Sequence, residues 1–298
     1  MFENLKDFKI VADSSINVTD MDKVDFEAVP LKIITDEKEF IDDGSIDTKE
    51  MLEYLDAYEG KSTTSCPNVA DWLKAFGDAQ NVFVITISSS LSGSYQAALM
   101  AKDMYEEEHE GRRVHVFDSL ATGPKMWLMA VRIKEDITAG MKFDEIVEDV
   151  EEYAKRVCLM FSLESLKNLA KNGRITPVVA AVAGVFGIRL LGIATKQGII
   201  DAIGKARGLK KAISGFVEQM DEHGFEGKRL DISHCENEKG ATMLADAVRQ
   251  KYPDCRITIT DCTGLCSYYA QRGGIIAGFE VIPDTKENTV PQTGKCFA

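Results

Sequence analysis

Short apolar runs alternate with amphipathic segments along the first half of the chain, and this alternation restricts the fold more than any other feature. Strands are predicted for residues 8–13, 26–34, 38–42, 82–87 and 113–119. Helices are predicted for residues 48–59, 67–76, a segment that begins near Gly93, and two segments within 124–155. Because strands that alternate with helices pair in parallel and are covered on both faces, we expect a mostly parallel sheet flanked by helices.

The pattern changes near residue 156, where the segment RVCLMFS begins a second set of elements. Further strands are predicted at 156–162, 189–195, 199–203, 228–233, 256–260 and 273–281, with helices at 163–171, 208–221 and 237–250 and an apolar helical stretch from 177. A chain of 298 residues is long enough for two domains of ordinary size. We therefore expect two α/β domains, residues 1–156 and 157–298.

The formal net charge of −13 argues against nucleic acid and anionic membranes as partners. A site for an anion must therefore use local donors rather than long-range attraction. The N-terminal residues lack a basic segment followed by an apolar one, and the apolar stretch 178–194 is interrupted by Arg189 and three glycines. We expect a cytoplasmic protein with no stable membrane insertion.

Seven cysteines are scattered along the chain without a C-x-x-C pair, and no set of zinc ligands is recognisable. We expect reduced, partly buried thiols, no metal site and no cofactor.

Hydroxyl-bearing residues dominate four predicted loops: 13–15 (DSS), 62–65 (STTS), 88–94 (SSSLSGS) and 118–123 (DSLATG). In a parallel α/β sheet, ligands bind where strands lead into helices at the carboxyl edge. Ser, Thr and Asp are also the preferred helix N-caps, so any one of these loops could simply cap its helix. Four such loops at one edge, with five hydroxyls between Ser88 and Ser94, favour a binding site.

The chemistry of the loop 88–94 is limited by what surrounds it. A strained nucleophile turn reads G-x-S-x-G, and the first glycine is missing before Ser92; the chain also has only four histidines. A phosphate loop needs a lysine where Ser94 follows Gly93. What remains is a neutral cradle of hydroxyls and backbone N–H groups at a helix N-terminus, suited to one small anionic group such as a carboxylate. No catalytic residue is predicted.

Several segments resemble the DegV family of bacterial fatty-acid-binding proteins along nearly the full length. They are DSS at 13–15, VPLKI at 29–33, TSCP at 64–67, ISSSLSGSYQAA at 87–98, FDSLATG at 117–123, SLKNLAKNGRI at 165–175 and GKARGLKKA at 204–212. The resemblance implies a two-domain α/β protein that encloses one long-chain fatty acid between its domains. It implies carboxylate ligands at Thr64, Ser92 and Gly93, and presentation of the acid to a separate ATP-dependent fatty acid kinase.

The resemblance also makes Arg207, Tyr269 and Ser65 possible contacts for the head group or the partner. Many relatives carry Gln at the position of Cys66 and Thr at that of Ser94. Many also carry a His-containing loop near the C-terminus, where Tyr269 stands here. A phenol can donate to a carboxylate but does not take up a proton near neutral pH, so a histidine role cannot be carried over.

The apolar stretch 177–194 is a candidate wall for the acyl tail, although its pattern favours plain core. The alternative function is an enzyme that acts on a small acidic metabolite at the same crevice.

Overall fold

A computed structural model describes residues 5–176, 179 and 187–282. Its N-terminal sheet is fully parallel, with the order β2-β1-β6-β7. The strands are β1 (Phe8–Asp13), β2 (Asp25–Val29), β6 (Asn81–Thr86) and β7 (Arg113–Asp118). Two short 3-10 helices, η1 (Leu5–Asp7) and η2 (Ser14–Ile16), flank β1. This sheet confirms the predicted mostly parallel arrangement.

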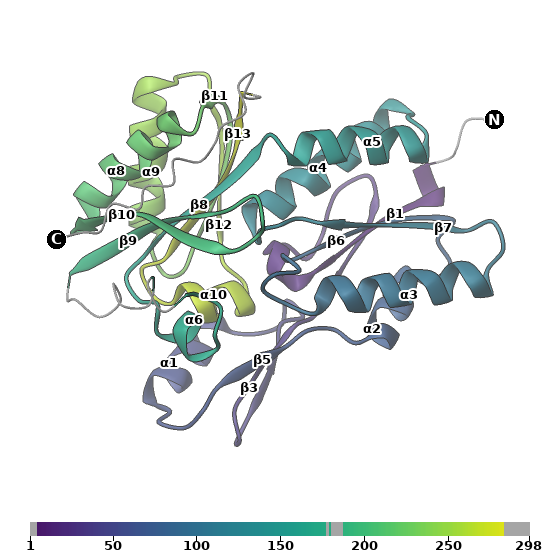
Figure 1. Ribbon diagram of the computed structural model, residues 1–298, viewed down its shortest axis with the longest axis horizontal. Coiled ribbons are helices and arrows are strands. Elements are labelled where there is room, and N and C mark those ends of the chain that lie inside the picture. The colour runs from purple at the N-terminus through teal and green to yellow at the C-terminus, as the bar shows by residue number, and fades with distance from the viewer. Residues whose placement is uncertain (1–4, 177–178, 180–186, 283–298) are drawn as a thin grey trace.

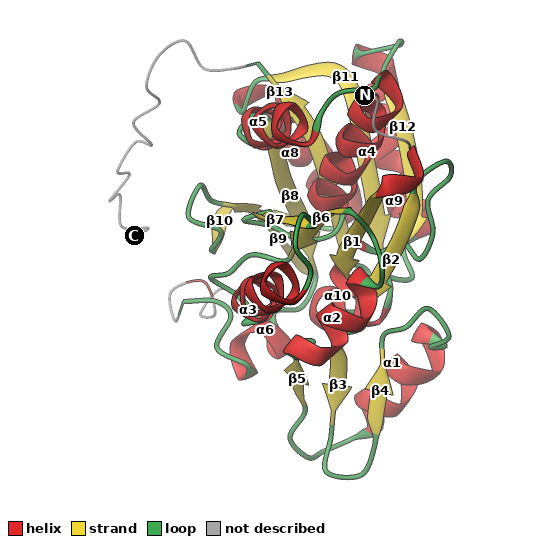
Figure 2. Cartoon of the chain, turned by 90° about the vertical axis from the view of Figure 1, so that its right-hand side faces the viewer, coloured by secondary structure: helices red, strands yellow, loops and turns green. Residues whose placement is uncertain are grey.

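Helices cover both faces of this sheet (Figure 2). Val82 and Val84 of β6 pack with α2 (Val69–Phe76) and α3 (Ser94–Glu108) on one face. Phe83 and Ile85 pack with α4 (Pro124–Ala139) and α5 (Phe143–Ala154) on the other. Because successive side chains of a strand point to opposite faces, a continuous apolar run such as 82–85 is typical of a strand buried on both sides.

A small antiparallel sheet projects below the parallel one (Figure 1). It has the order β4-β3-β5, with β3 (Lys32–Ile34), β4 (Glu39–Ile41) and β5 (Thr63–Ser65). Helix α1 (Thr48–Ala57) lies between β4 and β5 in the chain. The predicted single strand 26–34 is therefore wrong: β2 and β3 belong to different sheets, with Pro30 between them. Proline lacks an N–H for the strand ladder, so the chain leaves the first sheet there.

The second half forms a six-stranded mixed sheet with the order β10-β9-β8-β13-β11-β12. Its strands are β8 (Val157–Leu163), β9 (Ile188–Ala194), β10 (Ile200–Arg207), β11 (Phe225–His234), β12 (Arg256–Asp261) and β13 (Ile275–Val281). Only β11 and β12 pair in parallel. Helices α8 (Leu209–Glu222) and α9 (Glu238–Lys251) pack on one face, and the short helices α6 (Lys167–Lys171) and α10 (Gly264–Ala270) lie near the other.

Residues from both halves meet in one apolar cluster, which we call the interdomain cluster. It includes Ile33, Phe40, Met51, Leu52 and Ala121 from the first half and Leu159, Phe161, Leu163, Leu166, Leu169, Leu190, Tyr268 and Ile276 from the second. Helix α4 also contacts strands of both large sheets. We propose that the domain boundary lies at residue 156, where the chain passes from α5 to β8. Among the described helices, none is long and apolar enough to cross a membrane.

Candidate functional site

Three of the four hydroxyl-rich loops meet at the carboxyl edge of the parallel sheet, as predicted, and Asp13 joins two of them. Its carboxylate accepts hydrogen bonds from the Ile87 N–H at 2.8 Å and from the Ser94 and Ser15 hydroxyls at 2.7 and 2.5 Å. Burial raises the pKa of Asp13, and these hydrogen bonds oppose the rise because they stabilise the ionised carboxylate. Asp13 therefore fixes the start of α3 against the end of β1.

The fourth loop is different from what the sequence suggested. Residues 63–65 form β5 of the small sheet, where Thr64 pairs with Ile33 of β3, instead of a loop of the parallel sheet. Three residues without an apolar pattern give no strand signal, so only the pairing across space defines this strand.

Most serines of the loop 88–94 hold other parts of the chain. The Ser88 hydroxyl donates to the Gly198 carbonyl and the Ser90 hydroxyl to the Gln197 carbonyl, both at 2.7 Å. These carbonyls belong to the turn between β9 and β10, which we call the hairpin turn (residues 195–199). The two serines therefore connect the second sheet to the loop before α3. From the sequence alone, a helix-capping role was the simple alternative for such serines.

Ser92 and Gly93 stand at the exposed start of α3. Gly93 is the N-cap residue and offers no side-chain cap, and the half-buried Ser92 hydroxyl accepts only the Ser94 N–H, at 3.3 Å. A Cβ placed on Gly93 would lie 3.4 Å from Cys66 Sγ, so the end of β5 reaches this helix terminus. The TSCP and LSGS segments are thus brought together, and backbone N–H groups at a helix start attract an anion.

Thr64 meets a residue from the other end of the chain. Its hydroxyl lies 2.8 Å from the Tyr269 hydroxyl of α10. Burial raises the pKa of Tyr269, while Thr64 and the nearby Arg174 guanidinium oppose the rise. Thr64, Tyr269 and Arg174 therefore gather two hydroxyls and a cation beside the interdomain cluster, against which Tyr269 also packs.

Arg174 had no role in the sequence interpretation, although it lies within the segment 165–175. The same segment supplies Asn168 and Asn172, whose side-chain amides donate to the Tyr268 carbonyl at 2.7 Å and the Tyr268 hydroxyl at 2.9 Å. The Ser62 hydroxyl also lies 2.8 Å from the Tyr268 hydroxyl. The signal available in the sequence was an arginine close to two asparagines in a segment of mixed polar and apolar residues.

Two of the predicted contacts are not brought into this group. Ser65 is half-buried on β5, and alternation turns its side chain to the face opposite that of Thr64. Arg207 is exposed at the end of β10. Since a strand rises about 3.3 Å per residue, Arg207 lies on the order of 20 Å beyond Ile200 and the hairpin turn. This placement favours the partner contact, and contact of Arg207 with the head group stays a prediction.

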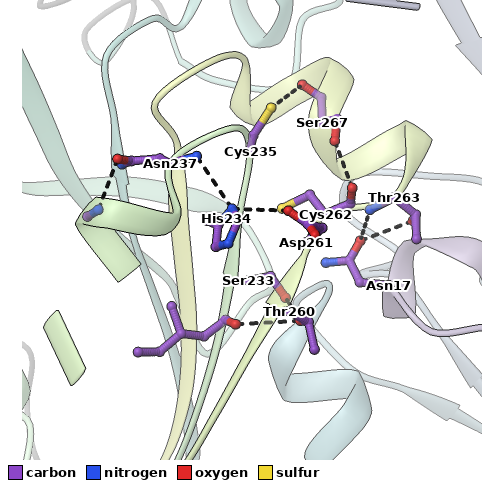
Figure 3. Close-up of polar contacts among 12 residues, drawn as sticks. Asn17, Ser233, His234, Cys235, Asn237, Thr260, Asp261, Cys262, Thr263 and Ser267 are labelled. Atoms are coloured by element: carbon purple, nitrogen blue, oxygen red, sulfur yellow. Dashed lines mark hydrogen bonds and ion pairs between the residues drawn. The ribbon is translucent and has the colours of Figure 1, made fainter. Parts of the chain in front are cut away.

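Among the described residues, no histidine, cysteine or carboxylate is hydrogen-bonded to Ser92. His234, at the end of β11, has Nδ1 3.3 Å from Asp261 Oδ1 and 3.4 Å from the Asn237 N–H (Figure 3). Burial raises the pKa of Cys235 to about 11 and of Cys266 to about 12, so these thiols stay protonated near neutral pH. Within the described ranges no group of His, Cys, Asp and Glu residues could hold a metal ion.

The chain is similar to known proteins along nearly its whole length. The family model described as "Uncharacterised protein, DegV family" matches residues 7–278. A DegV domain-containing protein of Streptococcus gordonii is 38% identical over 278 residues, which cover 92% of this chain and 99% of that protein.

Two solved structures are similar over 92% of this chain. One is a DegV family protein from Eubacterium eligens loaded with heptadecanoic acid, with 42% identity, a TM-score of 0.91 and 100% of that chain covered. The other is the Fatty Acid Kinase (Fak) B3 protein of Streptococcus pneumoniae loaded with linoleic acid, with 35% identity, a TM-score of 0.89 and 99% of that chain covered. The chain belongs to the DegV family.

Proposed function

We propose that this protein binds one long-chain fatty acid, with the carboxylate at Thr64, Ser92 and Gly93 and the tail in the interdomain cluster. The single observation that carries the proposal is that the segment 64–66 reaches both Tyr269, through Thr64, and the uncapped start of α3, through Cys66, beside apolar side chains from both halves. The similar proteins from Eubacterium eligens and Streptococcus pneumoniae were crystallised with such acids.

The head-group donors suit a carboxylate, because an ionised carboxylate accepts hydrogen bonds only and is costly to bury without them. Ser92 and Tyr269 each carry a hydroxyl proton that can turn toward the ligand, and the Gly93 backbone can approach without a side chain in the way. Arg174 adds a positive charge beside Tyr269. This set orients one end of the ligand, and we assign none of its members a catalytic step.

The tail supplies most of the binding free energy. Each buried methylene contributes about 0.8 kcal/mol, so a tail of sixteen to eighteen carbons offers roughly 10 kcal/mol before association costs of several kcal/mol. Of the predicted wall 177–194, residues 177–178 and 180–186 lie outside the described residues. Within the remainder, Leu190 belongs to the interdomain cluster, which supports a wall of β8 and β9 side chains.

We further propose that the protein has no cofactor and presents the acid to a separate ATP-dependent kinase in the cytoplasm. The similarity to the Fatty Acid Kinase (Fak) B3 protein supports this role. Arg207, exposed on the edge strand β10, is the proposed contact for the kinase. In this scheme the phosphoryl transfer is catalysed by the partner, and this chain supplies the carboxylate in a fixed orientation.

Extraction with organic solvent, followed by mass spectrometry, tests the function. Near-stoichiometric recovery of a long-chain acid is expected. Protein that yields no lipid and takes up neither palmitate nor oleate would exclude it, and turnover of a small acidic metabolite would instead favour an enzyme.

The cradle is tested with Ser92→Ala and Thr64→Ala. Loss of one hydrogen bond to a charged group costs about 1.5–3 kcal/mol, so each variant should bind roughly ten- to hundredfold more weakly. Ser89→Ala and Thr63→Ala are matched controls, because both side chains are exposed neighbours of the same chemistry. Unchanged affinity in Ser92→Ala and Thr64→Ala would show that the cradle is misassigned.

A further inference from the structure

Helix α10 carries Tyr269 into the proposed site, and its N-terminus is capped from far away in the chain. The N-cap residue Thr263 makes no side-chain cap. Its hydroxyl lies 3.1 Å from the Ser14 carbonyl, to which it can donate, and 3.1 Å from Asn17 Oδ1. Figure 3 shows the contact with Asn17. The Asp42 carboxylate takes the capping role instead. It accepts the N–H groups of Gly264 at 2.7 Å and of Leu265 at 2.9 Å.

Asp42 is firmly held in the small sheet. It directly follows β4, its N–H donates to the Leu31 carbonyl at 2.9 Å, and its carboxylate accepts the Ser14 hydroxyl at 2.9 Å. Its exposed fraction is 2%, and a Cβ on Gly264 would lie 2.8 Å from Asp42 Oδ1. The carboxylate and the first turn of α10 therefore touch with no room for a side chain or water between them.

The far end of α10 is held by the same small sheet through the other edge strand. Thr64 of β5 contacts Tyr269, and Ser62, just before β5, contacts Tyr268. Both β4 and β5 pair with β3, so the two attachments stand about two strand spacings, or roughly 10 Å, apart. Five residues of helix from Gly264 to Tyr269 rise about 7.5 Å, which matches this span.

We propose that Asp42 is a positioning residue for the carboxylate site: by capping α10 from the small sheet, it sets where the Tyr269 hydroxyl meets Thr64. This inference rests on the proposed fatty-acid function and adds a residue to it that touches no ligand. A buried carboxylate is well suited to this task because two charge-assisted hydrogen bonds and the helix dipole hold the helix start in one place. Free rotation or sliding of α10 would move Tyr269 away from Thr64.

The test is a double-mutant cycle read by fatty-acid affinity. Asp42→Ala should weaken binding of a fluorescent long-chain acid about three- to tenfold, the range expected for one misplaced hydrogen bond. In the Tyr269→Phe background, Asp42→Ala should cause no further loss, because the hydroxyl that Asp42 positions is already gone. Additive losses in the double variant would overturn the proposal.

Asp47→Ala is the matched control, since Asp47 caps α1 in the same region by accepting the Lys49 and Glu50 N–H groups, both at 3.0 Å. It removes the same chemistry without touching α10, so its affinity should stay within twofold of the wild type. An equal loss in Asp47→Ala would show that destabilisation of the region, rather than positioning, lowers the affinity.

A second readout follows Tyr269 directly. With 3-fluorotyrosine at position 269, the fluorine resonance should shift in Asp42→Ala and not in Asp47→Ala, even without ligand. If Asp42→Ala does not fold, Asp42→Asn enters the same cycle, because the amide keeps the size of the side chain but loses the charge and one of the two acceptor oxygens. An unchanged resonance and affinity in that variant contradict the inference. A wild-type protein that binds no fatty acid refutes the proposed function instead, and the fluorine shift still reports on α10.

Discussion

Replacement of Gly198 by alanine should separate the hairpin turn from the serine loop. Gly198 has φ +72°, and a Cβ there would overlap Ser88 Oγ and lie 3.1 Å from the Leu120 Cα. The left-handed conformation alone costs an alanine about 1–2 kcal/mol. The overlap also breaks the Ser88 hydrogen bond, worth about 1 kcal/mol, and forces the turn outward at a typical overpacking cost of about 1–3 kcal/mol.

We therefore expect Gly198→Ala to lower the free energy of unfolding by about 3–6 kcal/mol, a large part of the stability of an ordinary domain. Urea titration followed by tryptophan fluorescence measures this change. Gly140→Ala is the control, because Gly140 has a similar φ of +79° and nothing within 4 Å of an added Cβ. Gly140→Ala should lower the free energy of unfolding only by the backbone contribution of about 1–2 kcal/mol.

The contact between Gly198 and Ser88 can also be tested with a double variant. In Gly198→Ala, the added change Ser88→Ala removes the atom that the new Cβ overlaps, so the double variant should lose less stability than the sum of the two single variants. Equal losses in Gly198→Ala and Gly140→Ala, or strict additivity with Ser88→Ala, would refute the claim that the serine contact holds the turn.

Two further predictions concern the same connection and a buried acid. Ser88→Ala should lower the free energy of unfolding by about 1–2 kcal/mol, because it leaves the buried Gly198 carbonyl unpaired. Ser90→Ala, at an exposed position, should lower it by under about 0.5 kcal/mol. The rate of hydrogen exchange in residues 195–199 should rise only in Ser88→Ala. Burial and the neighbouring Asp149 raise the pKa of Asp136 to about 7 against the opposing effect of Arg132. Since the folded state then binds the extra proton, stability should fall as the pH rises from about 4 to 7. Asp136→Asn should flatten this slope in unfolding titrations at pH 5, 6, 7 and 8, and an unaltered slope would exclude Asp136 as its source.

The periodicity of the sequence was sufficient for the parallel sheet and its helices, because strands buried on both faces, such as 82–87, leave long apolar runs. It failed at β2 and β3, since one apolar run with a proline in it reads as one strand. The hydroxyl-rich loops were found because carboxyl ends of parallel strands share an edge. The second sheet was predicted as a set of strands, but nothing local to a strand specifies that β8, β9 and β13 pair in antiparallel order.

Contacts between distant segments account for what the sequence could not reveal in the site. Arg174 and Tyr269 are neighbours only because α6 and α10 lie together, and the capping of α10 by Asp42 links positions 222 residues apart. The charge of Arg207 was likewise visible in the sequence, whereas the length of β10 between Arg207 and the hairpin turn was not.

The hold of the small sheet on α10 has a consequence for synthesis on the ribosome. Asp42, Ser62 and Thr64 leave the ribosome early, but their partners Gly264, Tyr268 and Tyr269 are among the last residues to appear. At about 5–20 residues per second, the early half waits on the order of 10–40 s for them. During that time its carboxylate and hydroxyls face water instead of a helix. A nascent chain can therefore complete its parallel sheet long before it can hold a ligand, so the ability to bind is acquired only when the whole chain has been made.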